Sequence, residues 1–237
     1  MQDFKFDAAY YDRFINYLKN ISEPEYKSFS EKLTNGKYLM LGVRVPLLRA
    51  VAKEIYKTDY KGYLEVCRFS YYEDTIIFGF VVAEIKDYSE FIRYLPEYID
   101  KIDSWSLCDS VAMSPKTVKK NKKEFLEFLK PYIDSDKEFY VRFALICLLS
   151  CYIDKQNLDS IFKVCEEKDK LDHYYVKMGI AWLISAVFVK FPDETKEFLK
   201  NDGLSDFTHN KSIQKTIESY RVSDSDKIFI RGLKRIK

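Results

Sequence analysis

The feature that most constrains this chain is an almost unbroken succession of segments with helical periodicity. In the first segment, apolar side chains recur at the three- and four-residue intervals of one helix face: Tyr10, Phe14, Tyr17, Leu18 and Ile21. Only 7 Gly and 6 Pro occur in 237 residues, whereas folds made of many short strands need frequent turns. The sequence therefore predicts an all-α fold of long helices joined by short polar loops.

Helix boundaries follow from capping and breaking residues. The first helix is predicted from about Asp7 to Asn20. The second begins near Pro24, which suits a first helical turn, and stops at the C-terminal signal Asn35-Gly36. The remaining helices are predicted over 46–57, 60–69, 73–86, 88–100, 104–112, 116–131, 137–152, 156–167, 173–190, 192–201, 208–218 and 224–235.

Three helices that are apolar nearly all round carry a repeat signal. They open at Ile76, Val141 and Val176; the last two are 35 residues apart and the first two 65, about one and two periods of a helical-pair repeat. Such helices must be buried by neighbours on both sides, and alternation with amphipathic helices such as 116–131 gives two layers. The pattern predicts an α–α superhelix, with 1–237 as a single domain.

Charge and cysteine usage limit the partners and the cellular compartment that the sequence allows. A formal charge of +2 neither demands nor forbids a nucleic-acid partner. The five cysteines are odd in number and unpatterned, which suits a reducing cytosol. The N-terminus has no apolar signal-peptide core, and no apolar run reaches the roughly 20 residues of a membrane helix. We expect a cytoplasmic protein with no membrane partner, and nothing in the pattern indicates an oligomer.

Two cations stand out because they lie inside apolar helices. Arg142 is the only charged residue between Glu138 and Asp154, and Lys177 occupies the equivalent position of the next repeat. A cation in such a run is costly unless it reaches water or meets an anion, so both are candidates to hold DNA phosphates on one face. The alternative, equally weighted, is a pair of structural salt bridges or side chains that reach solvent.

A second candidate site follows Ile102. Asp103 or Ser104 is a plausible N-cap, which sets Trp105 and Asp109 four residues apart on one helix face. An indole beside a carboxylate suits a cationic ligand, although a core Trp with a solvated Asp is the commoner meaning of this spacing.

A basic cluster that includes Lys119 and Lys120 stands close in sequence to this helix. It is either a solvated face or a path for a DNA backbone. Trp182, the only other Trp, is by default a core residue.

Other catalytic templates are missing from the sequence. There is no Gly-rich phosphate loop, no Gly-x-Ser-x-Gly elbow and no Cys-x-x-Cys pair, and only two histidines occur. We therefore expect no metal and no cofactor, and chemistry that depends on carboxylate, aromatic and basic groups.

Four segments together resemble the AlkD family of DNA alkylation repair glycosylases. Residues 41–49, Leu-Gly-Val-Arg-Val-Pro-Leu-Leu-Arg, are similar to the family's Gly-Val-Arg-x-Pro-x-Leu-Arg signature, and 102–109 to its Asn/Asp-x-Trp-x-x-x-Asp segment. Residues 140–144 resemble the helix with a DNA-contacting Arg, and 174–182 the helix with a second active-site Trp. Order and spacing hold over roughly residues 10–200.

The resemblance implies a C-shaped stack of HEAT-like repeats with duplex DNA on a concave, basic face. It further implies hydrolysis of the N-glycosidic bond of cationic alkylated purines, such as 3-methyladenine and 7-methylguanine, without a pocket for the flipped base. Asp109 would stabilise the electron-deficient sugar and orient water, and Trp105 and Trp182 would line the deoxyribose. Arg142 would clamp a phosphate, with Lys177 and Tyr175 on the same DNA-binding surface.

One departure keeps two alternatives open. The family usually carries Trp-x-x-Arg after the second Trp, whereas this chain has Ser185 in place of the cation. The leading hypothesis is a DNA glycosylase. The second is a non-catalytic DNA-binding protein that recognises distorted or branched DNA, and the third is a protein–protein scaffold, a common use of helical solenoids.

Overall fold

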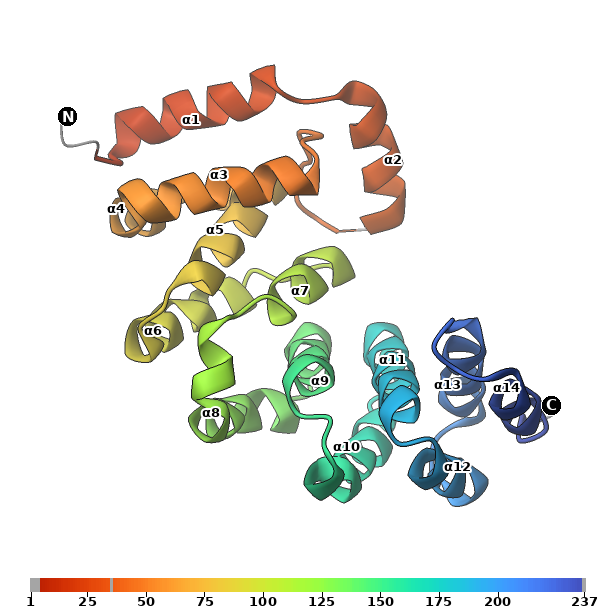
Figure 1. Cartoon of the computed structure of the whole chain (residues 1–237). Coiled ribbons are helices and arrows are strands. Elements are labelled where there is room, and N and C mark those ends of the chain that lie inside the picture. Colours follow the sequence, from red (N-terminus) through yellow and green to blue (C-terminus); the bar gives the residue numbers. More distant parts are fainter. Residues whose placement is uncertain (1–4, 35, 236–237) are drawn as a thin grey trace. The chain divides into compact units, whose positions relative to one another are not determined.

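The computed structural model describes residues 5–34 and 36–235, and this part of the chain is almost entirely helical (Figure 1). An isolated bridge between Leu39 and Tyr71 is its one extended pairing. The all-α prediction is confirmed. The helices are α1 Ala8–Asn20, α2 Pro24–Thr34, α3 Val45–Thr58, α4 Tyr60–Val66, α5 Tyr72–Glu84, α6 Tyr88–Ile99, α7 Trp105–Ala112, α8 Lys122–Asp134, α9 Glu138–Cys151, α10 Leu158–Asp169, α11 Tyr174–Lys190, α12 Pro192–Asn201, α13 Asp206–Glu218 and α14 Asp224–Arg231, with 3-10 turns η1 Thr117–Lys120 and η2 Lys155–Asn157.

The helices form two compact units, which divide between Lys122 and Lys123. In the first unit, α5 is the central helix: it packs against α3, α4, α6 and α7, and every residue from Tyr72 to Ala83 is buried. A Cβ added at Gly79 would lie 2.5 Å from the Tyr98 ring, so α6 approaches α5 closely only because this residue has no side chain. The prediction that this helix is buried on all sides is confirmed.

In the second unit, α11 has the central place. It lies between α9 and α13, and it also packs against α10 and α12, so that consecutive helical pairs form two layers (Figure 1). The apolar stretches of α9 and α11 are buried in this arrangement. The 35-residue recurrence therefore corresponds to successive helical pairs within this unit. The superhelix, the C shape and the single domain over 1–237 stay predictions.

Two predicted helices differ from the structure for local reasons, and the helix predicted over 224–235 ends earlier, at Arg231. The helix predicted over 116–131 is interrupted at Asn121, whose φ/ψ of −126°/38° is not helical and whose amide donates to the Thr117 carbonyl. It then continues past Pro131 to Asp134. The helix predicted over 60–69 ends at Val66, because Cys67 is extended and Phe69 has a φ of 51°. The predicted stop at Asn35 lies outside the described residues; α2 ends at Thr34.

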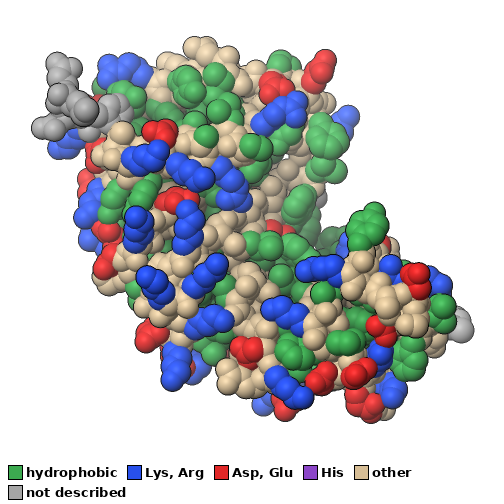
Figure 2. Space-filling model, in the orientation of Figure 1, with side chains coloured by type: hydrophobic (Ala, Val, Ile, Leu, Met, Phe, Trp, Pro, Cys, Tyr) green, Lys and Arg blue, Asp and Glu red, His purple; other side chains and the backbone are tan. Residues whose placement is uncertain are grey.

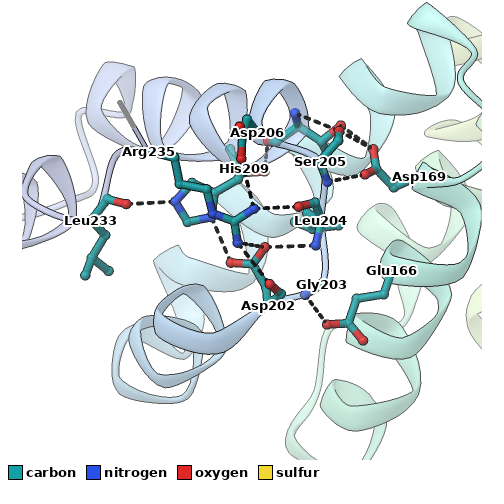
Figure 3. Close-up of polar contacts among 12 residues, drawn as sticks. Glu166, Asp169, Asp202, Gly203, Leu204, Ser205, Asp206, His209, Leu233 and Arg235 are labelled. Carbon is teal, nitrogen blue, oxygen red and sulfur yellow. Dashed lines mark hydrogen bonds and ion pairs between the residues drawn. The ribbon is translucent and has the colours of Figure 1, made fainter. Parts of the chain in front are cut away.

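Two buried polar clusters hold the end of the second unit together (Figure 3). His209 lies between two acceptors, Nδ1 2.8 Å from Asp202 Oδ2 and Nε2 2.9 Å from the Leu233 carbonyl oxygen. Arg235 donates to the other Asp202 oxygen, Oδ1, at 3.0 Å. These contacts attach the segment after α14 to α13 and to the loop before it.

The second cluster is centred on the carboxylate of Asp169, at the end of α10. It accepts hydrogen bonds from the Ser205 backbone N–H and from the hydroxyls of Ser205 and Thr208 (Figure 3). Ser205 is at the same time the N-cap of α13. The first turn of α13 is therefore fastened to α10, and neither cluster leaves a buried carboxylate without donors.

Candidate active site

Helix α7 begins at Trp105, and its start is built by two neighbouring polar residues. Ser104 is the N-cap with extended backbone, but its hydroxyl makes no capping hydrogen bond. The Asp103 carboxylate makes no capping hydrogen bond either. It accepts instead from the backbone N–H groups of Lys37 and Tyr38, the latter at 3.2 Å. Of the two predicted caps, Ser104 holds the position, while Asp103 fastens the loop after α2 to the start of α7.

The Trp105 side chain lies at the surface and not in the core. Its indole N–H donates to the Leu33 carbonyl oxygen at 3.0 Å, and 37% of the residue is exposed. Asp109 follows one helical turn later and is half-buried. The core alternative for Trp105 is therefore wrong. α7 presents an indole and a carboxylate one turn apart.

A cavity of about 270 Å³ adjoins Trp105 within the first unit. We call it the Trp105 cavity. Phe29 and Leu33 of α2 lie at its margin with 61% and 52% of their surface exposed, and Figure 2 shows hydrophobic side chains at the surface over α2. It is lined by Tyr26, Phe29, Ser30, Leu33, Thr34, Met40, Val43, Val45, Tyr72, Glu73, Trp105, Ser106 and Ser110.

Val43 of the signature loop over 41–43 lines this cavity, and a buried carboxylate holds the loop in place. Glu73 accepts from three successive backbone N–H groups, those of Leu41 (2.8 Å), Gly42 (2.7 Å) and Val43 (3.2 Å). Burial raises the pKa of Glu73, and the three hydrogen bonds oppose that shift. Gly42 has a φ of 103°, and a Cβ there would lie 2.7 Å from the Glu23 carbonyl oxygen. The loop therefore requires glycine at this position.

The two arginines of the signature are engaged inside the first unit. Arg44 forms a forked ion pair with Glu23, at 2.8–3.0 Å. Arg49 lies with its guanidinium carbon 4.0 Å from the centre of the Phe80 ring and donates to Ser114 Oγ at 3.1 Å. Arg44 thus joins the start of α3 to the start of α2, and Arg49 joins α3 to the end of α7.

Arg142 and Tyr175, two predicted DNA-binding residues, meet in the second unit. The guanidinium Nη1 donates to the Tyr175 carbonyl oxygen at 2.7 Å, and the guanidinium carbon lies 5.9 Å from the centre of the Tyr175 ring. Arg142 is only 5% exposed. The Tyr175 N–H in turn donates to Glu138, at 2.8 Å. Arg142 thus joins the start of α11 to α9.

Lys177 is part of a different local arrangement. Its ammonium pairs with Asp172 and lies 6.0 Å from the centre of the Phe207 ring. This contact lowers the pKa of the Asp172 carboxyl group, chiefly through the hydrogen bond from Lys177. Trp182 is half-buried on α11, one turn before the buried Ser185. The ion pair with Asp172 agrees with the alternative in which Lys177 forms a structural salt bridge.

Lys119 and Lys120 lie in η1 of the first unit, and both are exposed. Nearby, Lys116 pairs with Glu84 at 2.7 Å. The predicted site residues thus fall in both units: Trp105, Asp109, Lys119 and Lys120 in the first, and Arg142, Tyr175, Lys177 and Trp182 in the second. Their assembly into one site is a proposal.

Two of the cysteine thiols lie in surroundings that disfavour their ionisation. Burial raises the pKa of the Cys67 thiol to about 12, and burial also raises the pKa of Cys165. No group of three or more His, Cys, Asp or Glu in the described residues is placed to hold a metal ion. None of the described helices is long and apolar enough to cross a membrane.

The sequence reasoning missed Glu73 and Tyr72, both of which line the Trp105 cavity. The available signal was an acidic pair, Glu73-Asp74, directly before an apolar helix. The carboxylates of such a pair usually interact with the free N–H groups at the start of their own helix. Asp74 does so here, accepting from Ser70 and Tyr71, whereas Glu73 binds a distant loop, which spacing alone does not reveal.

A comparison with protein-family models matches residues 14–218 to the DNA alkylation repair enzyme family. The chain belongs to this family. The match covers most of both compact units and confirms the resemblance drawn from the four sequence segments. The family's description is that of an enzyme, which does not favour the non-catalytic alternative. A search of curated proteins finds no match.

Proposed function

We propose that the protein is a DNA glycosylase that hydrolyses the N-glycosidic bond of cationic alkylated purines in duplex DNA. Family membership supports a role in DNA alkylation repair, and the observation that carries the finer assignment is the pairing on α7. There the partly exposed indole of Trp105 stands one turn from the Asp109 carboxylate. An aromatic face and a carboxylate are the two groups that stabilise a cation at a protein surface.

The chemistry of the substrate explains why so few groups suffice. Alkylation makes the purine cationic and hence a good leaving group, so no strong general acid is needed. Its departure leaves an electron-deficient sugar that resembles the oxocarbenium ion of glycoside hydrolysis. In the proposal, Asp109 stabilises this sugar and orients the attacking water, and Trp105 and Trp182 line the deoxyribose.

The remaining predicted residues are assigned to the DNA backbone in this proposal. Lys119 and Lys120 are exposed and free to approach phosphates through solvent. Arg142, Tyr175 and Lys177, which are held by contacts within the second unit, are assigned to DNA phosphates on the ground of the family resemblance. In the proposal the protein is a monomer that acts in the cytoplasm without metal or cofactor, as the sequence pattern indicates, and without a flipping pocket, as the family resemblance implies.

The test is release of free methylated base from alkylated duplex DNA, measured for the parent protein and for Asp109→Asn. We expect release by the parent only, with DNA binding and the unfolding transition of the variant unchanged. Equal release by both proteins would remove Asp109 from the mechanism. An active family member serves as the positive control. If neither protein releases base while the control does, and if DNA binding is sensitive to salt, the result would instead support the non-catalytic alternative.

A further inference from the structure

An apolar groove runs between α1 and α3 in the first unit, where the two helices lie side by side (Figure 1). Its volume is about 830 Å³. We call it the α1–α3 groove. None of the residues assigned to the proposed active site or to DNA lines it. It is lined by Phe6, Tyr10, Arg13, Phe14, Tyr17, Leu47, Ala50, Val51, Lys53, Glu54, Ile55 and Thr58.

The groove is elongated along the two helices. On α1 its lining side chains extend from Tyr10 to Tyr17, and on α3 from Leu47 to Thr58, mostly at the three- and four-residue spacing of one helix face. A rise of about 1.5 Å per residue gives the α3 wall a length of about 16 Å. Ile55 is buried, whereas Tyr17 and Leu47 are 46% and 39% exposed. Apolar surface is thus open to a ligand over about three helical turns.

The floor of the groove is held in place by contacts within the first unit. Phe6 is buried there, and its ring makes edge contacts with Phe14 and Tyr63, at centroid distances of 5.8 and 5.2 Å. The Phe6 N–H donates to the Asp59 carboxylate at 2.7 Å, which fastens the segment before α1 to the start of α4. Because these walls are already ordered, a ligand binds without the cost of fixing them.

The charges at the edges of the groove are predominantly positive. Arg13 on α1 and Lys53 on α3 stand on opposite walls, and both are exposed. Neither forms an ion pair with a carboxylate in the described residues; the Arg13 guanidinium carbon lies 5.2 Å from the centre of the Tyr10 ring. The one acidic residue of the lining, Glu54, is paired with Lys57 at 2.7 Å. The apolar groove therefore has one cation without a counter-ion on each side.

This combination of shape and charge selects among ligands. A flat membrane surface would not reach the buried floor, and a nucleic-acid backbone would gain nothing from it. An amphipathic helix, in contrast, fills an elongated apolar groove with one face and carries polar side chains along both borders of that face. Cations on both walls favour a helix whose borders are acidic, because opposite charges across an interface steer and select the partner.

We propose that the α1–α3 groove is the docking site for an acidic amphipathic helix of a partner protein. The apolar face of that helix lies between Tyr17 and Leu47, and its carboxylates meet Arg13 on one side and Lys53 on the other. The inference is independent of the proposed glycosylase activity, since it concerns a protein partner and a surface that the proposed active site does not use.

The test uses two synthetic helical peptides of about 15 residues, enough to span the groove. Both carry Leu at helical spacing along one face, and they differ only in the residues beside that face, Glu in one peptide and Lys in the other. By fluorescence anisotropy at low salt, we expect the parent protein to bind the acidic peptide about tenfold more tightly than the basic one. High salt should reduce this preference.

Two variants address the groove. Arg13→Glu/Lys53→Glu reverses the charge on both walls and should reverse the preference, so that the basic peptide binds more tightly. Ala50→Trp fills the apolar space and should weaken binding of the acidic peptide about tenfold or more.

Lys32→Glu/Lys86→Glu is the matched control. It changes the net charge by the same amount at two exposed positions of the first unit that do not line the groove. It should leave the preference for the acidic peptide unchanged. Circular dichroism melting of each variant shows that the fold is intact, and base release by Ala50→Trp should equal that of the parent.

Several outcomes would overturn the proposal. Equal affinity of the parent for the two peptides would remove the charge complementarity, and an equal effect of the control variant would show a general effect of net charge. Binding of anionic lipid vesicles without binding of either peptide would assign the groove to a membrane. Self-association of the parent in sedimentation experiments, lost in Ala50→Trp, would assign the groove to a second copy of this chain.

Discussion

The indole N–H of Trp105 donates to the carbonyl oxygen of Leu33 across 3.0 Å, joining the start of α7 to the last turn of α2. The two residues are 72 positions apart in the chain. Through this bond, the side chain that we assign to the active site also fixes one wall of the cavity beside it.

Replacing the indole with a benzene ring tests this relationship. Trp105→Phe keeps an aromatic face but loses the N–H, and we expect the free energy of unfolding to fall by about 1 kcal/mol, the usual value of one hydrogen bond. Urea denaturation followed by circular dichroism measures the change. Trp182→Phe is the control, because no hydrogen bond from the Trp182 indole occurs in the described residues; an equal loss there would contradict the role of the Leu33 bond.

The carboxylate of Glu73 is expected to be essential for the loop over 41–43. In Glu73→Gln, one acceptor oxygen becomes an NH₂ group that faces backbone donors, so we expect a loss of at least about 2 kcal/mol in unfolding free energy. The exposed Glu25→Gln should change stability by less than about 0.5 kcal/mol. Similar stabilities of the two variants would show that the three N–H groups find other partners.

Asp226 gives a pH dependence of known sign. Hydrogen bonds from Lys196, 2.6 Å away, and from Ser223 lower the pKa of this carboxyl below its usual 3.8. A lowered folded-state pKa means that the stabilisation is complete above the ordinary value and is lost as the pH falls through it and then through the lowered one.

Asp226→Asn should therefore destabilise the protein at neutral pH, and the difference from the parent should shrink at about pH 3, below the ordinary pKa of 3.8. Thermal melts at both pH values measure it. Asp224→Asn, in the first turn of the same helix, is the control, and a difference that persists in acid would refute the linkage.

His209 is expected to contribute more to stability than the other histidine. His209→Leu leaves Asp202 Oδ2 and the Leu233 carbonyl without their shared partner in a buried site, and we expect a cost of about 3 kcal/mol. In the described residues the His173 ring makes one hydrogen bond, with the Asp136 carbonyl oxygen at 3.0 Å, and this bond is exposed. His173→Leu should cost less than about 1 kcal/mol in the same urea titration. Equal costs would show that the cluster in Figure 3 does not anchor the C-terminal segment.

Cys67 should be nearly inert in the folded protein. Since its pKa is raised to about 12, chiefly by burial, its thiolate fraction at weakly alkaline pH is about a thousandfold below that of a free thiol. Iodoacetamide labelling read by mass spectrometry should modify Cys67 slowly in the native state and fully in urea. Fast native labelling would show that the thiol is accessible and ionised.

Helical periodicity and capping residues predict most of the fold, because both act within a few residues of the chain. The apolar helices and the start at Pro24 are local properties, and the structure has them where they were predicted, whereas spacing left the N-cap of α7 open between Asp103 and Ser104. The interruption at Asn121 and the continuation past Pro131 were missed, since side-chain bonding and packing offset the local preference there.

Some features of the candidate site likewise follow from the sequence alone, and others depend on the tertiary structure. Sequence spacing by itself determined that Trp105 and Asp109 share one face of α7, because a helix places residues four apart above each other. Only the tertiary structure decided that Trp105 is exposed and bonded to Leu33, that Glu73 holds the signature loop, and that α2, α5 and α7 enclose a cavity. Those facts depend on contacts between segments about 30 to 70 residues apart, which no local pattern encodes.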